Sequence, residues 1–478
     1  MAITEGSDAT TMGLINSRVD EAVDTCSENI NSHINSHINY PLEKFRHSIP
    51  ALNVSLKIDS GHKSDRCLST SVFLNGPGGT QVPACVPAAM REYLLKTNSN
   101  VGAPFAESIQ TECLVAEARS AMAAFFNAEY PEEIFFGQNM SSVTFLLSDL
   151  LSQTWQAGDQ IILSELDHDS NIKPWVFAAR KRGVEVKYWP VNLCTMSLDF
   201  EDLLPMITSK TKLISVTMAS NLLGSMVDVS ELKALLKKSY ENLNIQIFID
   251  ATHASAHMPV DVRKIDCDFL ACSAYKFSGP HLGVLYVKKN IQKDLKDFLY
   301  KNFNSVSNGS NSEFSLELNL ETGTLNFEAL AGLLAILKYK GSMFSTVEKA
   351  LTTESLHRTM TAIFNYERDL IKLFLKGLSS QVLKNFTCLG WVDLNHPKTL
   401  CSRTPTFALM HKKFQSDQLA RYFSSRGLLT ASGQFHCSLL AKKLGLENSE
   451  GVWRIGFAYY TSKEEIEKLL NVMADISR

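Results

Sequence analysis

The stretch IDATHASAHMPVDVRKIDCDFLACSAYKFSGPHLGVLYVKK, from Ile249 to Lys289, decides the fold of this chain. Within it, Leu270-Ala271-Cys272 reads as a buried strand, and Ser273-Ala274-Tyr275-Lys276 follows directly. Residues at the carboxyl ends of strands in an open α/β sheet face the ligand crevice. A lysine is rarely buried, and a desolvated lysine has a lowered pKa and a free amine that forms a Schiff base. We therefore expect Lys276 to hold an aldehyde cofactor; a surface lysine is the alternative.

Two further strands bring polar side chains to the same edge of the sheet. The run from Ile245 to Ile249 alternates and then becomes apolar, which puts Asp250 at the tip of a second buried strand. A carboxylate there pairs with the pyridinium nitrogen of pyridoxal phosphate and keeps the ring protonated. A helix N-cap aspartate is the plainer reading. A third strand, from Lys212 to Thr217, leads to Asn221, which adds an amide.

The phosphate of such a cofactor needs a site of its own. The run from Glu133 to Phe136 reads as a strand, and the turn Gly137-Gln138-Asn139-Met140-Ser141 leads into a helical run from Val143 to Trp155. Backbone amides at a helix start bind phosphate, helped here by the hydroxyl of Ser141 or Ser142. Turns of this kind are common in α/β proteins, so this signal is weak by itself.

A further strand end carries an imidazole. The strand from Gln160 to Leu163 is followed by His168 and Asn171. The ring of His168 can lie flat on a pyridine ring, and Asn171 can reach the substrate side. A histidine satisfied within a loop is the alternative for His168.

The order of these motifs resembles the class V aminotransferase family of fold type I pyridoxal-phosphate enzymes, and within it the cysteine desulfurase-like branch. The resemblance runs colinearly over roughly residues 70 to 478. Its stretches are FLNGPGGTQVP from Phe73, NSNVGAPFAES from Asn98, LDHDSNIKPW from Leu166, ASNLLGS from Ala219, the opening stretch from Ile249, ETGTLNFEAL from Glu321 and VWRIGFAYYTSKEEIEKLL from Val452. The fold implied is α/β, with a large domain on a mainly parallel seven-stranded sheet and a smaller C-terminal α/β domain.

The resemblance implies a role for each matched residue. Lys276 is similar to the lysine that forms the internal aldimine and later moves protons at Cα. Asp250 matches the partner of the pyridinium nitrogen, and His168 matches the stacking imidazole. The remaining cofactor positions are Asn221 at the phenolic oxygen, and Asn139, Met140 and Ser273 at the phosphate.

Two matched residues reach beyond the cofactor. Thr324 resembles the residue that crosses a dimer interface to the partner subunit's phosphate, which implies a homodimer. Arg454 is similar to the arginine that grips the substrate carboxylate, for which a guanidinium offers a bidentate fork. Asn171 is the second residue that we expect to bind the substrate.

Two positions depart from the desulfurase pattern. Where desulfurases usually have glutamine the chain has His253, and where they usually have histidine before the lysine it has Tyr275. Both substitutions are similar to the arrangement in kynureninase. Both residues still belong to the expected cofactor site, but the identity of the substrate stays open.

A desulfurase also needs a mobile cysteine thiolate to attack the substrate sulfur. The run Gly433-Gln434-Phe435-His436-Cys437 resembles the segment that carries this cysteine in one desulfurase group. Aligned without a gap, His436 falls on the nucleophile position and Cys437 lies one residue later. Cys437 is our candidate nucleophile, and a small buried cysteine is the alternative.

The composition is that of an ordinary globular chain. Of 478 residues, 45% are hydrophobic and 20% are charged, which suits two domains with sizeable cores. The formal net charge of −3 predicts no attraction to nucleic acid or membranes, and no apolar run is long enough for a membrane span. The ten cysteines form no Cys-x-x-Cys pair, so we expect no metal site and no disulfide framework. The lack of a signal peptide favours the cytoplasm.

We expect three segments along the chain. Residues 1–65 form a partly ordered N-terminal extension that packs on the small domain or on a partner subunit; its near-repeat with His33 and His37 is better read as a solvated arm than as a metal site. Residues 66–328 form the large cofactor-binding domain. Residues 329–478 form the small domain, joined by part of the N-terminal segment.

Elements are also predicted by periodicity and capping. Helices are expected from Glu107 to Phe126 and from Glu231 to Asn242, and strands from Thr406 to Met410 and from Val452 to Tyr460. Ser462 and Glu465 form a capping box before the last helix, whose apolar face comprises Ile466, Leu469, Leu470 and Met473.

The expected activity is that of a pyridoxal-phosphate-dependent transferase or lyase acting on an amino acid through an external aldimine. A cysteine desulfurase-like C–S lyase is the first reading, with a sulfur acceptor protein as a candidate partner. An aminotransferase, an epimerase or a kynureninase-like hydrolase is the alternative within enzymes. A cofactor-binding scaffold without turnover has no support in the sequence, since the lysine and the aspartate are both present.

Overall fold

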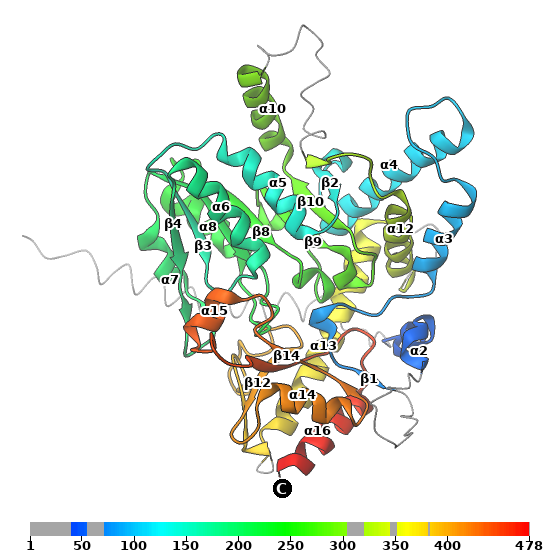
Figure 1. Cartoon of the computed structure of the whole chain (residues 1–478), viewed down its shortest axis with the longest axis vertical. Helices are drawn as coiled ribbons and strands as arrows, with labels where there is room; N and C mark the ends of the chain where they lie inside the picture. The colour runs from blue at the N-terminus through cyan, green and yellow to red at the C-terminus, as the bar shows by residue number, and fades with distance from the viewer. Residues whose placement is uncertain (1–39, 55–70, 304–319, 345–350, 381–382, 478) are drawn as a thin grey trace, which may run out of the picture.

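The computed structural model describes residues 40–54, 71–303, 320–344, 351–380 and 383–477. Most of the expected N-terminal extension, including His33 and His37, lies outside the described residues. Figure 1 shows an upper lobe built around a large sheet and a lower lobe that contains the C-terminus. Among the described helices, none combines the length and the apolar character needed to cross a membrane.

The large domain is centred on a seven-stranded sheet. Its strand order is β2 (Ile134–Gly137), β10 (Gly283–Val287), β9 (Phe269–Ser273), β8 (Gln246–Asp250), β7 (Thr211–Thr217), β3 (Gln160–Ser164) and β4 (Glu185–Trp189). β10 runs antiparallel to both of its neighbours, and the other pairs are parallel. All residues of β3, β9 and β10 are buried, as expected where helices cover both faces. The predicted fold class is confirmed.

The register of the parallel strands brings three strand ends together. Thr217 at the end of β7 pairs with Asp250 at the end of β8, and Asp250 pairs with Ala271 of β9. The chain therefore leaves β7, β8 and β9 at one edge of the sheet, with Ser273 and the segment after it at the same edge. This is the edge at which an open α/β sheet binds its ligand.

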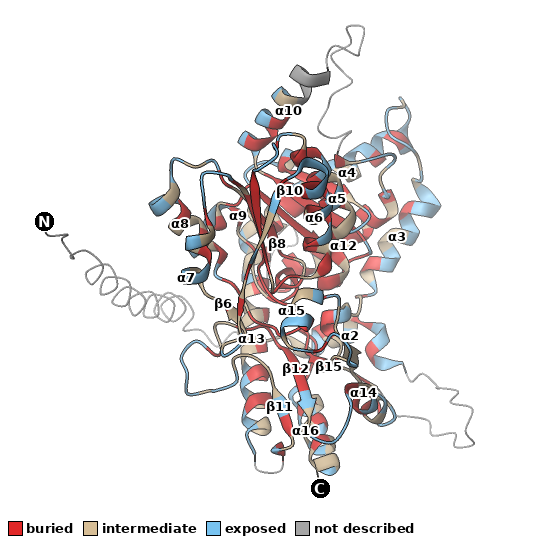
Figure 2. Cartoon of the chain, turned by 60° about the vertical axis from the view of Figure 1, so that its left-hand side comes forward, coloured by how far each residue is buried: buried red, intermediate tan, exposed pale blue. Residues whose placement is uncertain are grey.

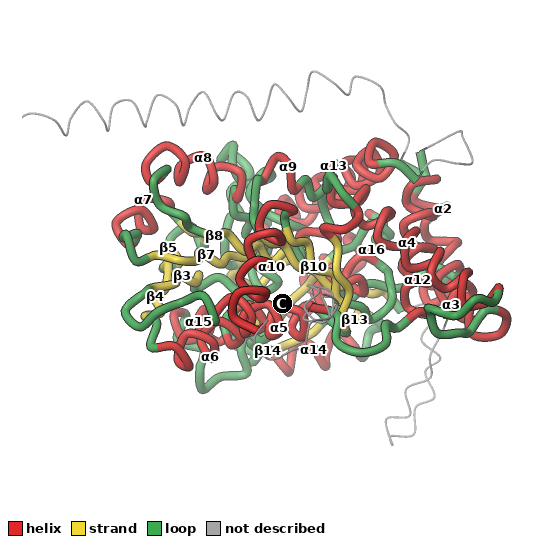
Figure 3. Tube along the Cα trace, turned by 90° about the horizontal axis from the view of Figure 1, so that it is seen from above, coloured by secondary structure: helices red, strands yellow, loops and turns green. Residues whose placement is uncertain are grey.

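Two layers of helices enclose the sheet, as Figure 3 shows from above. One face is covered by α4 (Ala106–Phe126), α8 (Val229–Tyr240), α9 (Val262–Ile265) and α12 (Phe327–Ser342), and the other by α5 (Met140–Ser152), α6 (Lys173–Arg182) and α10 (Lys289–Phe303). Side chains alternate between the layers along each strand. In β8, Ile247 and Ile249 pack into the first layer and Phe248 into the second. Figure 2 shows this buried centre and the exposed outer sides of the helices.

Smaller elements complete the large domain. The helix α3 (Cys85–Lys96) packs on α12, and the hairpin of β5 (Val191–Asn192) and β6 (Ser197–Leu198) is followed by α7 (Phe200–Leu203). α12 packs on α3 and α4 of the large domain and also contacts α13 (Thr353–Leu378), whereas the small domain was expected to begin at residue 329. The three-segment boundaries stay a prediction.

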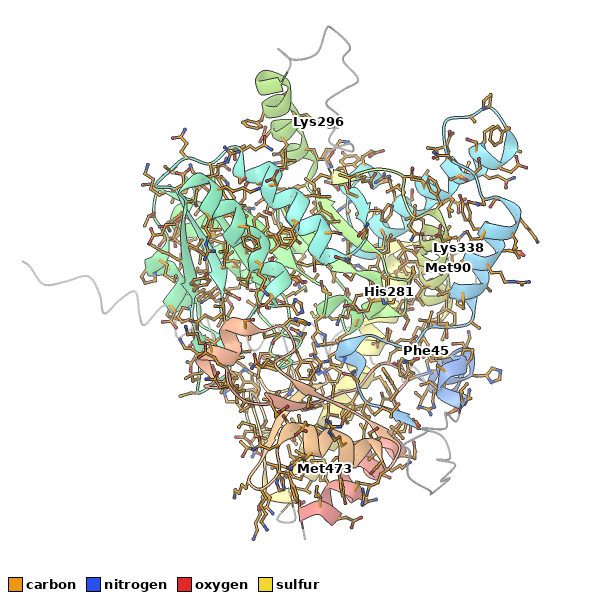
Figure 4. The ribbon with its side chains drawn as sticks, viewed as in Figure 1. Phe45, Met90, His281, Lys296, Lys338 and Met473 are labelled. Carbon is orange, nitrogen blue, oxygen red and sulfur yellow. The ribbon has the colours of Figure 1, made fainter. Side chains whose placement is uncertain are left out.

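The small domain has an antiparallel sheet in the order β11 (Phe386–Cys388), β12 (Thr406–His411), β15 (Val452–Gly456) and β14 (Ala431–Gly433). Its helices are α13 (Thr353–Leu378), α14 (Ser416–Ser424), α15 (Ser438–Lys443) and α16 (Lys463–Ser477). Figure 4 labels Met473 in α16, within the lower lobe. β1 (Val72–Phe73) pairs with β13 (Leu428–Leu429), so the first residues of the expected large domain join the small one.

One predicted strand is too long. β15 ends at Gly456 rather than Tyr460, because the amide of Phe457 turns to the carbonyl of Pro405 at 3.0 Å. Gly456 packs directly on Pro77, where an added Cβ would lie 2.0 Å from the proline ring. The predicted capping box of α16 is confirmed: the Ser462 amide donates to Glu465 at 2.9 Å, and the Glu465 amide donates back to Ser462 at 3.3 Å.

The described part of the N-terminal extension packs on the body of the molecule. The helix α2 (Leu42–Ser48) buries Phe45 completely, and Figure 4 labels this residue beside the junction of the lobes. The hydroxyl of Tyr40 donates to the carbonyl of Tyr459 at 2.7 Å, and Arg46 forms an ion pair with Glu465 at 2.9 Å. These residues therefore tie α2 to the start of α16.

Candidate active site

A cavity of about 720 Å³ lies at the strand ends where the two domains meet. Figure 4 labels one of its residues, His281, in the middle of the molecule. Most of the residues predicted for the cofactor site line this cavity: Asn139, Met140, His168, Asn221, Asp250, His253, Ser273, Tyr275 and Lys276. The cavity is also lined by residues that the sequence reading did not assign: Phe145, Asp169, Lys173, Thr217, Thr252, His281 and His436 among them.

Lys276 stands in the short helical turn that follows β9, spanning Ala274–Phe277. Its side chain is only 8% exposed, and its amine donates a hydrogen bond to the carbonyl of Pro77. Burial, reinforced by the nearby charge of Arg454, lowers the pKa of Lys276 to about 7. A large fraction of this lysine is thus unprotonated near neutral pH, which is the form that attacks a carbonyl.

Asp250 lies at the floor of the same cavity. Its carboxylate accepts a hydrogen bond from the amide of Thr252 at 2.8 Å and is almost completely buried. Burial raises the pKa of Asp250, which the amide of Thr252 and the charge of Lys276 only partly offset. A protonated ring nitrogen in the cavity would supply the missing positive charge. The site therefore fits the pyridinium of pyridoxal phosphate.

His168 borders the cavity from the loop after β3. Its Nδ1 accepts a hydrogen bond from the amide of Ser170 at 3.0 Å, so the proton of the neutral ring is on Nε2. Burial and the neighbouring His436 lower the pKa of His168 to about 4. The ring is accordingly neutral at physiological pH, as suits an imidazole that stacks on another ring.

The start of α5 forms the polar end of the cavity. The side chain of Asn139 caps this helix by accepting from the Ser142 amide at 2.9 Å, and the Met140 amide donates to the Ser273 hydroxyl at 2.9 Å. Among the described residues, the Ser141 amide has no hydrogen-bond partner. A free amide at a helix start, next to hydroxyls, is a fitting place for a phosphate group.

Three buried polar atoms around the cavity lack a hydrogen-bond partner within the described residues: Thr252 Oγ1, His253 Nδ1 and Arg454 Nε. Buried polar atoms are nearly always paired in native proteins. His253 uses its other nitrogen to contact the hydroxyls of Thr404 and Thr406, at 3.1 and 3.0 Å. These unpaired atoms suit a site that is completed by a polar ligand.

Tyr275 presents its ring to the cavity beside Lys276. The amine of Lys276 lies 5.0 Å from the centre of this ring, and the ring of His281 stacks on it at 5.1 Å. Gly79 lies against the same ring, since an added Cβ would be 3.2 Å from it. Tyr275 therefore forms a side wall of the cavity near the reactive amine.

Arg454 lies beside the cavity rather than in its lining. Its guanidinium donates to the backbone carbonyl of Asn221 at 2.9 Å and to the side chain of Asn75 at 3.0 Å. The Phe435 ring stacks on it, 3.6 Å from the guanidinium carbon. Burial lowers the pKa of Arg454 to about 9. No carboxylate pairs with this buried cation among the described residues, which leaves it suited to an anionic ligand.

The structure places Cys437, the candidate nucleophile, in the core, as in the alternative of a small buried cysteine. The side chain is completely buried, is not part of the cavity lining and donates to Asn221 Oδ1 at 3.1 Å. Burial raises the pKa of Cys437 far above that of an ordinary thiol, which is the opposite of what a nucleophile needs. The preceding residue, His436, lines the cavity instead.

Asn171, the other residue expected at the substrate, also lies outside the cavity lining. This side chain is completely buried below the cavity, where it accepts from Trp175 at 3.0 Å and from Ser215 at 2.9 Å and donates to Asp167 at 2.7 Å. With its amide engaged in this way, Asn171 holds the loop after β3 and does not face a substrate. Thr324 is exposed and lies outside the cavity lining.

Asp167 is the main polar residue that the sequence reading missed. Burial raises its pKa to about 8, against hydrogen bonds from Ser164 and Asn171. Its position next to His168 was the available signal, but the network around it depends on residues of other strands. Thr252, two residues after Asp250, could have been found by the same strand-end rule.

Comparison with known proteins agrees with this geometry. The family described as aminotransferase class-V matches residues 72–469. The aminotransferase-like protein FGM3 of Gibberella zeae is 28% identical over 84% of this chain and 93% of its own length. A probable cysteine desulfurase of Mycoplasma genitalium is 30% identical over 75% of this chain and 80% of its own length.

Solved structures show the same architecture. The cysteine desulfurase of Thermococcus onnurineus NA1 superposes with a TM-score of 0.73 at 25% identity, covering 92% of this chain and 98% of the other. The family match spans both domains and includes Lys276, Asp250 and Arg454. The chain belongs to the aminotransferase class-V family.

Proposed function

We propose that the protein is a pyridoxal-phosphate-dependent C–S lyase of the cysteine desulfurase-like kind, acting on an amino acid. The observation that carries the proposal is the meeting of Lys276, Asp250 and His168 at one cavity, where burial lowers the pKa of the lysine to about 7. The names of the relatives, two of which are cysteine desulfurases, support carbon–sulfur cleavage as the reaction.

When bound, pyridoxal phosphate supplies an electrophilic aldehyde and a ring that accepts electrons. In this cavity Lys276 would hold the aldehyde and then carry a proton to or from the substrate Cα. Asp250 would keep the ring nitrogen protonated, and His168 would lie against the ring face. The start of α5 and the Ser273 hydroxyl would bind the phosphate.

Arg454 and Asn75 would hold the substrate carboxylate. Arg454 has an unpaired Nε and a fixed position between Asn75 and the backbone of Asn221. A carboxylate that replaces one of these neutral acceptors gains a charge-assisted hydrogen bond. The closure of Phe435 over the guanidinium would exclude water from this pair.

The environment of Cys437 favours elimination of sulfide over transfer of sulfur to the enzyme. A desulfurase that forms a persulfide needs a thiolate that reaches the substrate sulfur, whereas Cys437 is buried and bonded to Asn221. The expected products from cysteine are then hydrogen sulfide, pyruvate and ammonia. A sulfur acceptor protein would be required only if alanine and an enzyme persulfide formed instead.

Product analysis tests this function. Protein loaded with pyridoxal phosphate should be yellow and should release sulfide from cysteine, and Lys276→Ala should abolish both the colour and the sulfide. Colourless wild-type protein after cofactor addition would contradict the proposal. Cofactor-loaded protein that releases no sulfide, but moves an amino group to a keto acid or exchanges the Cα proton, would indicate an aminotransferase or epimerase.

A homodimer is part of the proposal. The α3–α4 patch, defined as Leu94, Leu95, Val101, Phe105 and Ile109, exposes side chains that are 45 to 67% accessible. These exposed apolar side chains lie on the end of α3, the start of α4 and the segment between them, and such a group suits an interaction site. The exposed position of Thr324 also suits a residue that reaches a partner subunit. We place this enzyme in the cytoplasm, to which the eight described cysteines, all free thiols, are suited.

A further inference from the structure

The segment between β14 and α15 has an unusual backbone next to the cavity. Phe435 and His436 are consecutive and both left-handed, with φ of 52° and 57°. Residues other than glycine are uncommon in this region; histidine is found there more often than most, but a bulky residue such as Phe435 is an outlier. Such strain persists only where the surroundings enforce it, and it gathers at functional sites. The two residues are therefore held in place by specific contacts.

Residues of the cofactor loops provide these contacts. The amide of Asp169 donates to the carbonyl of His436 at 2.6 Å, and its carboxylate accepts from the Ser438 hydroxyl at 2.7 Å. On the other side, the side-chain amide of Asn221 donates to the carbonyl of Phe435 at 3.1 Å. The turn is thus fixed at both residues by the loops that follow β3 and β7.

What this turn presents to the cavity is the imidazole of His436. Its ring centre lies 5.3 Å from that of His168, with the planes tilted by 53°. Among the described residues, no hydrogen bond or ion pair engages this imidazole, although the backbone on both sides of it is bonded. The neighbouring Cys437 points into the core instead. The strained backbone therefore places the imidazole of His436 at the cavity and the thiol of Cys437 in the core.

The two histidines differ in what they can do. His168 is half-buried, uses Nδ1 to accept from Ser170 and remains neutral. His436 is exposed at the open side of the cavity, where both ring nitrogens are available for proton exchange. The other titratable groups around the turn are already engaged: Asp169 pairs with Lys173 at 2.8 Å, and Lys276 bonds to Pro77. An imidazole so placed is the usual acid in catalysis.

We propose that His436 is a catalytic acid that protonates the sulfur leaving group of the substrate. This inference rests on the proposed C–S lyase function. Lys276 takes the proton from Cα, the C–S bond breaks with its electron pair on sulfur, and His436 gives its proton to that sulfur. Cysteine and one water then yield hydrogen sulfide, pyruvate and ammonia, so no oxidant, reductant or enzyme thiol is consumed. Solvent returns the proton to His436.

The test compares two substrates that differ in the leaving group. Hydrosulfide, the leaving group from cysteine, is far more basic than chloride, so a proton from an acid assists its departure, whereas chloride leaves β-chloroalanine without one. His436→Gly removes the imidazole and suits the left-handed backbone. We expect it to lower kcat for sulfide release from cysteine about 100-fold, with little loss for chloride release. Added imidazole should restore part of the activity with cysteine.

The strain gives a readout that does not depend on the loaded enzyme. Without cofactor, His436→Gly should melt at a temperature at least as high as wild type, because glycine removes the left-handed strain. Asn127→Gly, at another left-handed position (φ 54°) outside the cavity lining, is the matched control and should leave both reactions unchanged. A melting temperature several degrees below wild type would show that the turn does not store strain, and would overturn the claim that strain holds His436 at the cavity.

The kinetic results distinguish the proposed role of His436 from the C–S lyase function on which it rests. Equal loss with both substrates, or no loss with either, would overturn the role of His436 while the C–S lyase function stands. Cofactor-loaded wild-type protein that releases no sulfide would overturn both. Selective loss with cysteine together with imidazole rescue supports both.

Discussion

The burial of Lys276 has a consequence for how the cofactor is captured. Its pKa of about 7, lowered mainly by burial, means that the amine is protonated and unreactive below this pH and free above it. The rate at which cofactor-free protein takes up pyridoxal phosphate should therefore rise with pH through a midpoint near 7 and level off by about pH 8.5. Absorbance after rapid mixing measures this rate. A rate that still climbs tenfold per pH unit at pH 9 would contradict a perturbed lysine.

Cys437 allows a second test at the residue scale. Its thiol is buried and bonded to Asn221, so Cys437→Ala should keep most of the sulfide release from cysteine and cost about 1 kcal/mol of unfolding free energy. Sulfide electrodes and urea denaturation measure the two effects. Loss of sulfide release with the cofactor still bound would instead make Cys437 the nucleophile.

Single residues could be predicted where their position is set by the strand they follow. Lys276, Asp250 and His168 each stand just after a buried strand, and parallel strands end at the same edge, so the sequence alone brings them together. Asn171 and Cys437 could not be placed in this way. Whether they face the cavity or the core depends on Ser215 and Asn221, which are distant in the sequence.

At the scale of elements, the start of α16 carries a testable contact. Glu465 accepts from the Ser462 amide within the cap and also pairs with Arg46 of α2. Ser462→Ala should remove one capping bond and cost about 1 kcal/mol of unfolding free energy. Glu465→Ala should cost about 2 kcal/mol, since it also frees the partly buried Arg46. Urea denaturation distinguishes the two; a smaller loss for Glu465→Ala than for Ser462→Ala would mean that Arg46 contributes nothing.

Most elements follow from periodicity, and their ends follow from tertiary contacts. The predicted strands of the large sheet coincide with β2, β3, β7, β8 and β9 to within about two residues, because a buried strand needs an unbroken apolar run. β15 was overextended because the apolar run continues to Tyr460, whereas the strand ends where Gly456 meets Pro77. A glycine beside a proline from another segment gives no local signal.

At the scale of the whole molecule, the α3–α4 patch predicts a dimer that is needed for activity. A charge in its centre, as in Leu95→Glu or Phe105→Glu, should produce a monomer with reduced cofactor retention and little loss of stability. Phe177→Glu, at an equally exposed aromatic residue on α6, should remain dimeric and active. Sedimentation velocity decides between these results. A wild-type monomer that retains its cofactor would contradict the dimer.

The fold class could be predicted from the sequence, but the pairing of individual strands could not. Alternating strands and helices indicate a mainly parallel sheet covered on both faces. The antiparallel β10 and the pairing of β1 with β13 link segments that only the folded chain brings together. The contacts of Tyr40 with Tyr459 and of Arg46 with Glu465 likewise join segments that are distant in the sequence.

The attachment of the cofactor to Lys276 is the claim on which the rest depends. Borohydride reduction of the cofactor-loaded protein, followed by mass spectrometry of its peptides, locates the lysine that carries the pyridoxyl group. The peptide with Lys276 should carry it in wild type, and no peptide should carry it in Lys276→Ala. A group on another lysine, or none on a yellow and folded protein, would contradict the assignment of this cavity as the active site.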